Sequence, residues 1–413
     1  MGRAVLMVAF HFPPAAMGSG HLRTLGFARY LPGSGWDPIV LSARAMAYPQ
    51  TAPIVPGSIP DGCAVHRALA FDARRHFGIA GKYPGFLGAP DRWSSWWPSA
   101  VWQGLRLIRR HRVQAIWSTY PIMTAHCIAH SLHRITGLPW IADFRDPVAS
   151  SADMTDARSA ASRHHWESRV LQTASRSVFT TPGTLREYAE RYPKLHAECR
   201  LIVIENGYDE RAFTNLSRLA PRQTGGPLVL VHSGLLYPRG RNPVPFLTAL
   251  AQLKNSGLVG ADGLRVILRA SRSVKEFTRE IQRLGLGDMV FLYPAISYRD
   301  ALIEQATADA LLLFQGAEFD RQIPAKLYEY LRIGRPIFAL TSDLGDTANV
   351  LRNTGGAETA PIDDVDAIAS RLAAFIRVLR EGRAPVTDPS VVKQYSRENG
   401  ALLLAKQFEQ VSA

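Results

Sequence analysis

The chain has little cysteine and no long apolar run. Its three cysteines, Cys63, Cys127 and Cys199, stand too far apart to form a four-ligand metal cluster or a disulfide framework. No stretch approaches the ~20 apolar residues that span a bilayer. The apolar start is interrupted by His-Phe-Pro-Pro at residues 11–14, which favours a first β-strand over a signal peptide. These absences favour a globular protein of a reducing cytoplasm.

Acidic residues are also in deficit. The chain has 35 Asp and Glu residues and 48 Lys and Arg residues, which gives a net charge of +13. Such a charge favours anionic partners, namely phosphorylated small molecules, anionic lipid headgroups or nucleic acid. Nucleic acid is the least favoured, because the sequence has no helix-turn-helix, zinc-finger, RRM or KH signature and its basic residues are dispersed. We therefore expect no nucleic-acid partner.

Strand-like apolar runs alternate with helical patterns from end to end, which is typical of parallel sheets covered on both faces. Residues 217–227 are rich in Arg, Gln, Gly and Pro and are predicted to form a linker. The sequence thus predicts an α/β protein with two doubly wound Rossmann-like domains facing across a cleft, residues 1–210 and 220–392. A final helix within residues 393–413 would cross back to the first domain. Ligands of such sheets bind at the carboxyl ends of the strands.

Residues 323–336 are predicted to form a loop, one short helix and a turn. Pro324 suits the first helical position, and Gly334 suits the position just past the helix end. Lys326 and Glu329 lie three residues apart and can point the same way. The helix start would offer amides and a lysine to a diphosphate, with a carboxylate one turn deeper for ribose hydroxyls. An ordinary amphipathic helix after a loop is the alternative.

Residues 11–23 are predicted to form a loop that follows a strand and opens a helix. Gly18 and Gly20 would let the backbone approach a ligand closely. The loop is neither a Gly-x-Gly-x-x-Gly fingerprint, since position 23 is Arg23, nor a phosphate loop of the Walker type. His21 could act as a base or a ligand, or could simply cap or pack the helix start.

Two further loops carry charged residues. Asp143, Arg145 and Asp146 stand at the end of a predicted buried strand, where desolvated charges need partners. They could pair among themselves, or could face the cleft and position acceptor hydroxyls or a general base. In the loop within residues 231–243, Arg239 and Arg241 could clamp a diphosphate, or the loop could be a solvated basic segment.

Residues 91–112 mix tryptophans with arginines. This pattern suits a surface that contacts a membrane, with indoles at headgroup depth and cations on lipid phosphates. Tryptophans at helical spacing also occur in protein cores, and that alternative stays open at this point.

Together these motifs resemble a GT-B glycosyltransferase of the large bacterial family 4. The matching pieces occur in order over nearly the whole chain, at residues 12–23, 35–41, 142–147, 206–209, 232–243 and 324–336. The resemblance implies transfer of a sugar from a nucleotide diphosphate-sugar to a saccharide or lipid-linked saccharide acceptor, usually with retention. It implies no cofactor and no essential metal. The implied setting is cell-surface polysaccharide or glycoconjugate biosynthesis, either in the cytoplasm or at the inner face of the cytoplasmic membrane.

The resemblance also implies residue roles. Glu329 would hold the donor ribose, and Arg241 and Lys326 would hold the diphosphate together with nearby amides. The donor site would comprise Gly18, Gly20, Gly234, Arg239, Arg241, Gln322, Ile323, Lys326, Leu327 and Glu329. The acceptor would meet His21, Arg23 and Asp143, and the catalytic candidates are Asp143, Arg145, Asp146 and Arg241.

The chain departs from the family pattern at two positions. Many members carry a pair of glutamates, of which Glu329 matches the second, but Arg321 stands at the first. A histidine often expected after the fourth predicted strand is replaced by Arg145. Two alternatives therefore remain, a catalytically silent scaffold or partner subunit and a sugar-nucleotide epimerase.

Overall fold

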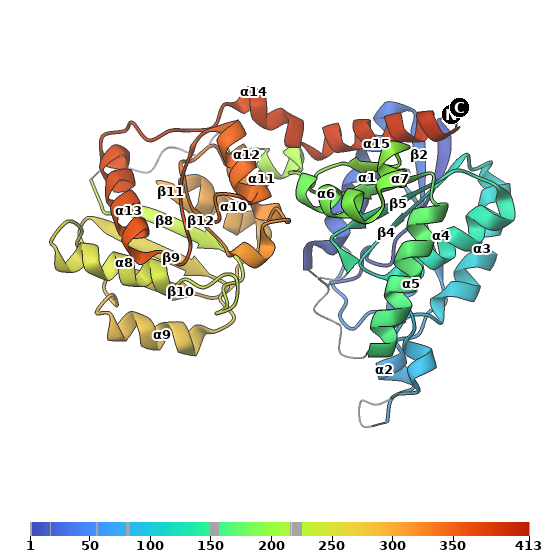
Figure 1. Cartoon of the computed structure of the whole chain (residues 1–413), viewed down its shortest axis with the longest axis horizontal. Coiled ribbons are helices and arrows are strands. Elements are labelled where there is room, and N and C mark those ends of the chain that lie inside the picture. The colour runs from blue at the N-terminus through green and yellow to red at the C-terminus, as the bar shows by residue number, and fades with distance from the viewer. Residues whose placement is uncertain are drawn as a thin grey trace. The chain divides into compact units, whose positions relative to one another are not determined.

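The computed structural model describes residues 2–16, 18–54, 57–79, 83–148, 157–214, 216 and 225–412 (Figure 1). The chain divides into two compact units. Unit 1 comprises Met1–Asn206 together with Arg397–Ala413, and unit 2 comprises Gly207–Ser396. The sequence placed these borders near residues 210 and 392. Most of the predicted linker lies outside the described residues.

Unit 1 is built on a parallel sheet of seven strands in the order β3-β2-β1-β4-β5-β6-β7. The strands are β1 (Arg3–Val8), β2 (Trp36–Ala43), β3 (Ala64–Ala68), β4 (Ala115–Thr119), β5 (Trp140–Arg145), β6 (Arg176–Phe179) and β7 (Leu201–Val203). The α-helices are α1 (Leu22–Tyr30), α2 (Ala73–His76), α3 (Trp96–His111), α4 (Met123–Thr136), α5 (Ala157–Thr173), α6 (Pro182–Arg191), α7 (Pro193–Ala197) and α15 (Arg397–Ser412). Short 3₁₀ turns are η1 (Gly18–His21), η2 (Leu31–Ser34), η3 (Ala45–Ala47) and η4 (Gly85–Gly88).

The sheet of unit 1 is buried on both faces, as expected for parallel strands. Leu6 and Val8 of β1 point into one apolar cluster, to which α3, α4 and α5 contribute, whereas Val5 and Met7 point into a second cluster with α1 and α15. The last helix therefore completes unit 1, although it follows unit 2 in the sequence.

Unit 2 repeats the same organisation with a parallel sheet of six strands in the order β10-β9-β8-β11-β12-β13. The strands are β8 (Leu228–Ser233), β9 (Leu264–Arg269), β10 (Val290–Tyr293), β11 (Ala310–Gln315), β12 (Ile337–Thr341) and β13 (Ala357–Ala360). The α-helices are α8 (Val244–Asn255), α9 (Val274–Arg283), α10 (Tyr298–Thr307), α11 (Ala325–Ile333), α12 (Asp346–Thr354), α13 (Val365–Arg380) and α14 (Pro389–Val392). The 3₁₀ turns are η6 (Glu210–Phe213), η8 (Ala317–Phe319) and η9 (Lys393–Tyr395).

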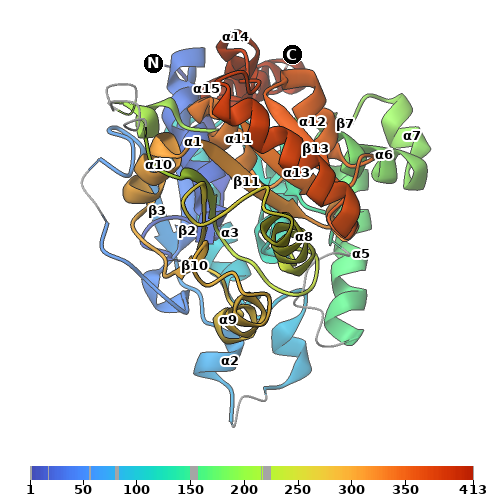
Figure 2. The same cartoon turned by 90° about the vertical axis from the view of Figure 1, so that its left-hand side faces the viewer.

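Two layers of helices cover the sheet of unit 2 (Figure 2). Buried residues of α8, α9 and α13 join one apolar cluster, and those of α10, α11 and α12 join the other. In both units the first strand lies beside the fourth, so the strand order reverses there. Ligands of open α/β sheets bind at the carboxyl ends of the strands at such a reversal. In unit 2 this reversal lies between β8 and β11.

Both predicted Rossmann-like sheets are present, and the fold class is confirmed. The sequence did not single out two edge strands, β3 and β13. Each is short and only partly buried, so neither shows the strong apolar run that marks a central strand. Among the described residues, no helix combines the length and the apolar character that a bilayer crossing requires.

Candidate functional site

Helix α11 begins close to where it was predicted, at the carboxyl end of the unit 2 sheet. Pro324 is the N-cap, with φ −65° and ψ 130°, and therefore lies one position earlier than expected. Gly334 has the predicted left-handed conformation, with φ 73°. The first turn of a helix leaves amides without intrahelical partners and carries a partial positive charge. Ile323 and Leu327 are buried, so they anchor this helix start.

Lys326 projects from the first turn of α11 onto His232 at the end of β8. Its Nζ lies 3.3 Å from His232 Nε2. His232 Nδ1 lies 2.8 Å from the carbonyl oxygen of Leu312 on β11. A carbonyl can only accept, so Nδ1 carries the proton and Nε2 presents a lone pair. The lysine ammonium therefore donates to Nε2, and the imidazole fixes its position.

Burial, and secondarily the charge of Arg241, lowers the pKa of Lys326 to about 7. Burial and then the Lys326 charge lower the pKa of His232 well below its ordinary value. The imidazole is therefore neutral at physiological pH, whereas Lys326 is poised to gain or lose its proton. A buried amine of this kind gains most from an anion that restores its charge.

Gly234 provides the space for this lysine. It follows β8 with φ 142°, a conformation that glycine adopts readily and other residues adopt only with strain. A Cβ built on Gly234 would lie 2.1 Å from Lys326 Nζ. Any side chain here would therefore displace the ammonium group.

Arg241 supplies a second cation from the loop between β8 and α8. Its guanidinium carbon lies 5.7 Å from the ring centres of both Tyr237 and Phe319. Because its charge depresses the pKa values of Lys326 and His232, the three basic groups share one electrostatic site. Arg239, by contrast, is exposed and forms no ion pair with any described residue.

Glu329 lies one turn deeper in α11, where Tyr298 Oη donates a hydrogen bond of 2.7 Å to its Oε1. Tyr298 opens α10 and is 48% exposed, and Tyr293 and Ile296 just before it are also exposed. Sequence reasoning missed Tyr298. The sequence signal that could have identified Tyr298 was the residue before it, Ser297. The Ser297 side chain caps α10 by accepting a hydrogen bond from the amide of Asp300, which places Tyr298 at the start of the helix.

The loop before α11 brings a further carboxylate close to the backbone. A Cβ built on Gly240 would lie 2.6 Å from Glu318 Oε1, and one built on Gly316 would lie 2.5 Å from Glu318 Oε2. Arg321, which stands at the first glutamate position of the resembled family, is exposed. Gln322 turns its carbonyl oxygen inward, where Gln315 Nε2 donates to it at 2.7 Å. Gln322 therefore shapes the loop through its backbone.

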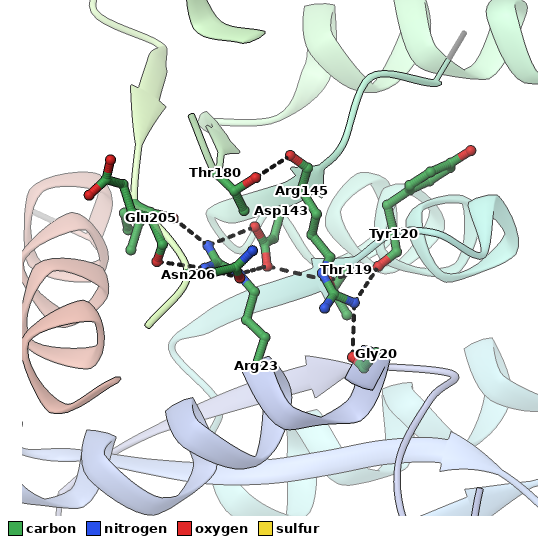
Figure 3. A network of polar contacts seen from close by, with 10 residues as sticks. Gly20, Arg23, Thr119, Tyr120, Asp143, Arg145, Thr180, Glu205 and Asn206 are labelled. Atoms are coloured by element: carbon green, nitrogen blue, oxygen red, sulfur yellow. Dashed lines mark hydrogen bonds and ion pairs between the residues drawn. The ribbon is translucent and has the colours of Figure 1, made fainter. Parts of the chain in front are cut away.

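In unit 1, Arg23 and Asp143 form a buried bidentate pair (Figure 3). Arg23 Nε donates to Asp143 Oδ2 at 2.8 Å, and Nη2 donates to Oδ1 at 3.1 Å. Arg23 also donates to the carbonyl oxygens of Ile204 and Glu205. Both Asp143 carboxylate oxygens are engaged and the residue has no exposed surface, so Arg23 joins α1 to β5 and to the segment after β7. This geometry favours a positioning role.

Arg145 ends β5 in a left-handed conformation, with φ 62°. Its Nη1 donates to the carbonyl oxygens of Gly20 at 2.9 Å and Tyr120 at 3.2 Å (Figure 3). The hydroxyl of Thr180 donates to the Arg145 carbonyl oxygen at 2.8 Å. Such strain persists where surrounding contacts hold it. Arg145 therefore fixes the η1 turn, which contains Gly18 and Gly20. Asp146, the next residue, is exposed.

His11 is a residue of this loop that sequence reasoning did not select. Both of its ring nitrogens are buried without a hydrogen-bond partner among the described residues. Burial, followed by the charges of Arg145 and His21, lowers its pKa to about 4. A Cβ built on Gly20 would lie 3.1 Å from His11 Nδ1. The signal for His11 was its place three residues after the end of the first strand, in the loop that contains Gly20 and His21.

The described residues contain no group of three or more His, Cys, Asp or Glu side chains that could hold a metal ion. The site of unit 2 is instead cationic. It combines a helix start, Lys326 and Arg241 near the point where the strand order reverses, with the Glu329 carboxylate beside them. Such an arrangement can hold an anion next to a polyol.

Similar solved structures identify the fold of the chain. No protein-family model matches the chain, and no curated protein matches it. Sucrose-phosphate synthase from Thermosynechococcus elongatus is 14% identical, with a TM-score of 0.64 over 99% of this chain and 98% of its own. The fold is GT-B.

Two other GT-B structures contain nucleotides. HepE from Anabaena in complex with UDP-glucose is 14% identical, with a TM-score of 0.61 over 98% of this chain and 99% of its own. The catalytic domain of starch synthase IV from Arabidopsis thaliana, bound to ADP and acarbose, is 14% identical, with a TM-score of 0.57 over 100% of this chain and 99% of its own. At these identities the similarity establishes the fold alone.

Proposed function

We propose that the protein is a glycosyltransferase that moves a sugar from a nucleotide diphosphate-sugar to a saccharide or lipid-linked saccharide acceptor. The observation that carries the proposal is the convergence of Lys326, Arg241 and the start of α11 in unit 2, with Glu329 one turn deeper. Similar structures containing UDP-glucose and ADP support a nucleoside diphosphate as the bound group.

In this proposal the diphosphate lies against the α11 amides, Lys326 and Arg241. Cleavage of the sugar–phosphate bond leaves negative charge on the diphosphate, and fixed cations and amides stabilise the charge that develops in the transition state. We expect these groups to carry that charge without an essential metal ion or cofactor. The Glu329 carboxylate accepts hydrogen bonds from the ribose hydroxyls, and exposed Tyr293 and Ile296 lie along the strand and loop that we assign to the base.

The loops of unit 1 would serve the acceptor. Arg145 holds the backbone of the Gly20 turn, and the Arg23–Asp143 pair holds the chain after β7, so these residues would position the acceptor-binding loops. His21 belongs to that turn, and His11 lies beside it. We expect retention at the anomeric carbon, as the resemblance to family 4 implies, and a role in polysaccharide or glycoconjugate biosynthesis. A lipid-linked acceptor would place the protein at the inner face of the cytoplasmic membrane.

Isothermal titration calorimetry with UDP, GDP, ADP and dTDP tests the donor site. We expect one of these nucleotides to bind, and we expect R241A and E329A each to weaken that binding. The exposed neighbour Arg239 provides a matched control, because R239A removes a charge from the same loop and should have a smaller effect. Unchanged binding of every nucleotide by R241A and E329A would refute the proposed site.

A catalytically silent scaffold is the second candidate, because Arg321 replaces the first glutamate of the family pair. Donor turnover with candidate acceptors separates the two candidates. A transferase releases the nucleoside diphosphate only as the acceptor is glycosylated, whereas a scaffold binds the nucleotide without turnover. Product analysis without acceptor would reveal an epimerase.

A further inference from the structure

One face of unit 1 carries positive charge that the proposed reaction does not use. Helix α3 buries Trp96, Ala100, Gly104 and Leu107 against the rest of the unit. Gly104 makes close packing possible, because a Cβ there would lie 2.8 Å from Leu132 of α4. The opposite face presents Trp102, Arg106, Arg109 and Arg110 to solvent, and we call these four residues the α3 stripe.

The stripe combines an exposed aromatic ring with unpaired cations. Trp102 is 60% exposed, and the guanidinium carbon of Arg106 lies 4.7 Å from its ring centre. Helix α3 contains no acidic residue. Throughout the part of the chain that the structure describes, no carboxylate forms an ion pair with Arg106, Arg109 or Arg110. An unpaired cluster of this kind creates a local positive potential.

The stripe also borders a hollow in the surface. A cavity of about 550 Å³ is lined by the four stripe residues together with His66, Gln103 and Leu107. His66 comes from β3, the edge strand of the sheet. Burial, followed by the charges of His111 and Arg110, lowers the pKa of His66. The hollow is therefore suited to an anionic group.

We propose that the α3 stripe docks unit 1 on an anionic lipid bilayer. Indole rings favour the headgroup region, since one edge is polar and the ring is apolar. Arginines bind lipid phosphates through paired N–H groups. Three unpaired arginines beside one exposed tryptophan provide both parts of such a contact. This inference concerns where the protein binds, and it holds whether or not the protein transfers a sugar.

The structure excludes two of the tryptophans in residues 91–112 from the predicted membrane contact. Trp93 and Trp96 are only 5% and 0% exposed and belong to the core of unit 1, so they cannot reach a membrane. Trp102 alone of these three presents its ring. A single stacking ring is poorly suited to single-stranded nucleic acid, which binds along a groove with several aromatic side chains.

Co-sedimentation of the full chain with vesicles tests the proposal. One set contains phosphatidylcholine alone, and the other contains phosphatidylcholine with roughly one third phosphatidylglycerol. We expect binding to the second set only, and we expect it to weaken as salt shortens the Debye length below about 10 Å. Each membrane-facing arginine contributes a roughly fivefold factor, so R106E/R110E should lower partitioning by at least about twenty-five-fold. At high salt the apolar contribution to vesicle binding persists, so W102S should lower partitioning there beyond the loss that salt alone causes.

A charge-matched variant provides the control. K275E/R279E makes the same change in net charge on exposed positions of α9 in unit 2, and it should bind vesicles with only a small loss. Circular dichroism melting curves check that each variant is folded. Equal binding to neutral vesicles, an equal loss in K275E/R279E, or no vesicle binding would overturn the proposal. Tighter binding of a single-stranded oligonucleotide through Arg106 and Arg110 would assign the stripe to nucleic acid and also overturn it.

Discussion

Nucleotide affinity should fall as the pH rises from 7 to 9, because Lys326 loses the charge that holds the diphosphate. Burial and Arg241 place the pKa of this amine at about 7 in the free protein. A bound diphosphate raises that pKa, since an adjacent anion favours the ammonium form. Nucleotide affinity is therefore highest at pH values at which Lys326 of the nucleotide-free protein is already protonated. It declines as the pH rises above the pKa of Lys326 in that nucleotide-free state.

The size of the decline follows from the charged fraction. With a free pKa of about 7, about half of the lysine is protonated at pH 7 and about one hundredth at pH 9, so the affinity should fall about fiftyfold, or about 2.3 kcal/mol. Burial holds the His232 imidazole neutral across this window, and burial raises the pKa of Tyr330 far above it. The terminal phosphate of UDP is mostly ionised above its pKa of about 6.

Calorimetric titration with UDP at constant ionic strength measures this dependence. K326R keeps a charge at every pH in the range and should give a nearly flat profile, whereas K326M should bind weakly at every pH. Repeating the wild-type titration at pH 8 in buffers of different ionisation enthalpy should reveal proton uptake on binding. A flat wild-type profile, or a K326R profile as steep as that of the wild type, would refute the reasoning.

Three further predictions concern other parts of the two units. G234A should weaken UDP binding more than tenfold, because its Cβ displaces Lys326 Nζ. G257A is the control, because Gly257 also has a positive φ but has open space around it, so this variant should destabilise the fold without changing UDP affinity. Equal UDP affinities of G234A and G257A would contradict this prediction. R23M should lower the free energy of unfolding by about 3–5 kcal/mol by leaving Asp143 buried and unpaired, and denaturant titration in which R23M/D143N fails to recover part of the loss would count against it. E329Q should weaken UDP binding about tenfold, as expected for a lost charge-assisted hydrogen bond, but leave pyrophosphate binding unchanged; equal losses for both ligands would exclude a ribose contact.

Local sequence patterns were sufficient to predict the fold class and the helix at the start of the candidate site, α11. Pro324 and Gly334 marked the ends of α11 to within one residue, because proline and glycine have strict backbone requirements at helix ends. The alternation of apolar runs and helical patterns gave both sheets. The edge strands β3 and β13 were missed because they are partly exposed, which weakens the apolar pattern on which such predictions depend.

The side-chain pairs could not be predicted, since each joins residues far apart in the sequence. Arg23 and Asp143 are 120 residues apart, and sequence reasoning assigned both to the acceptor without predicting that they pair with each other. Lys326 and His232 are 94 residues apart, so the tautomer and position of the imidazole followed only from the fold. Tyr298 likewise reaches Glu329 only because α10 and α11 pack side by side.

A crystal structure of the protein with UDP tests the central claim most directly. The account predicts the diphosphate at the start of α11, within hydrogen-bond distance of Lys326 Nζ and the Arg241 guanidinium, with the ribose hydroxyls on Glu329. A well-ordered UDP whose diphosphate contacts neither Lys326 nor Arg241 would contradict it.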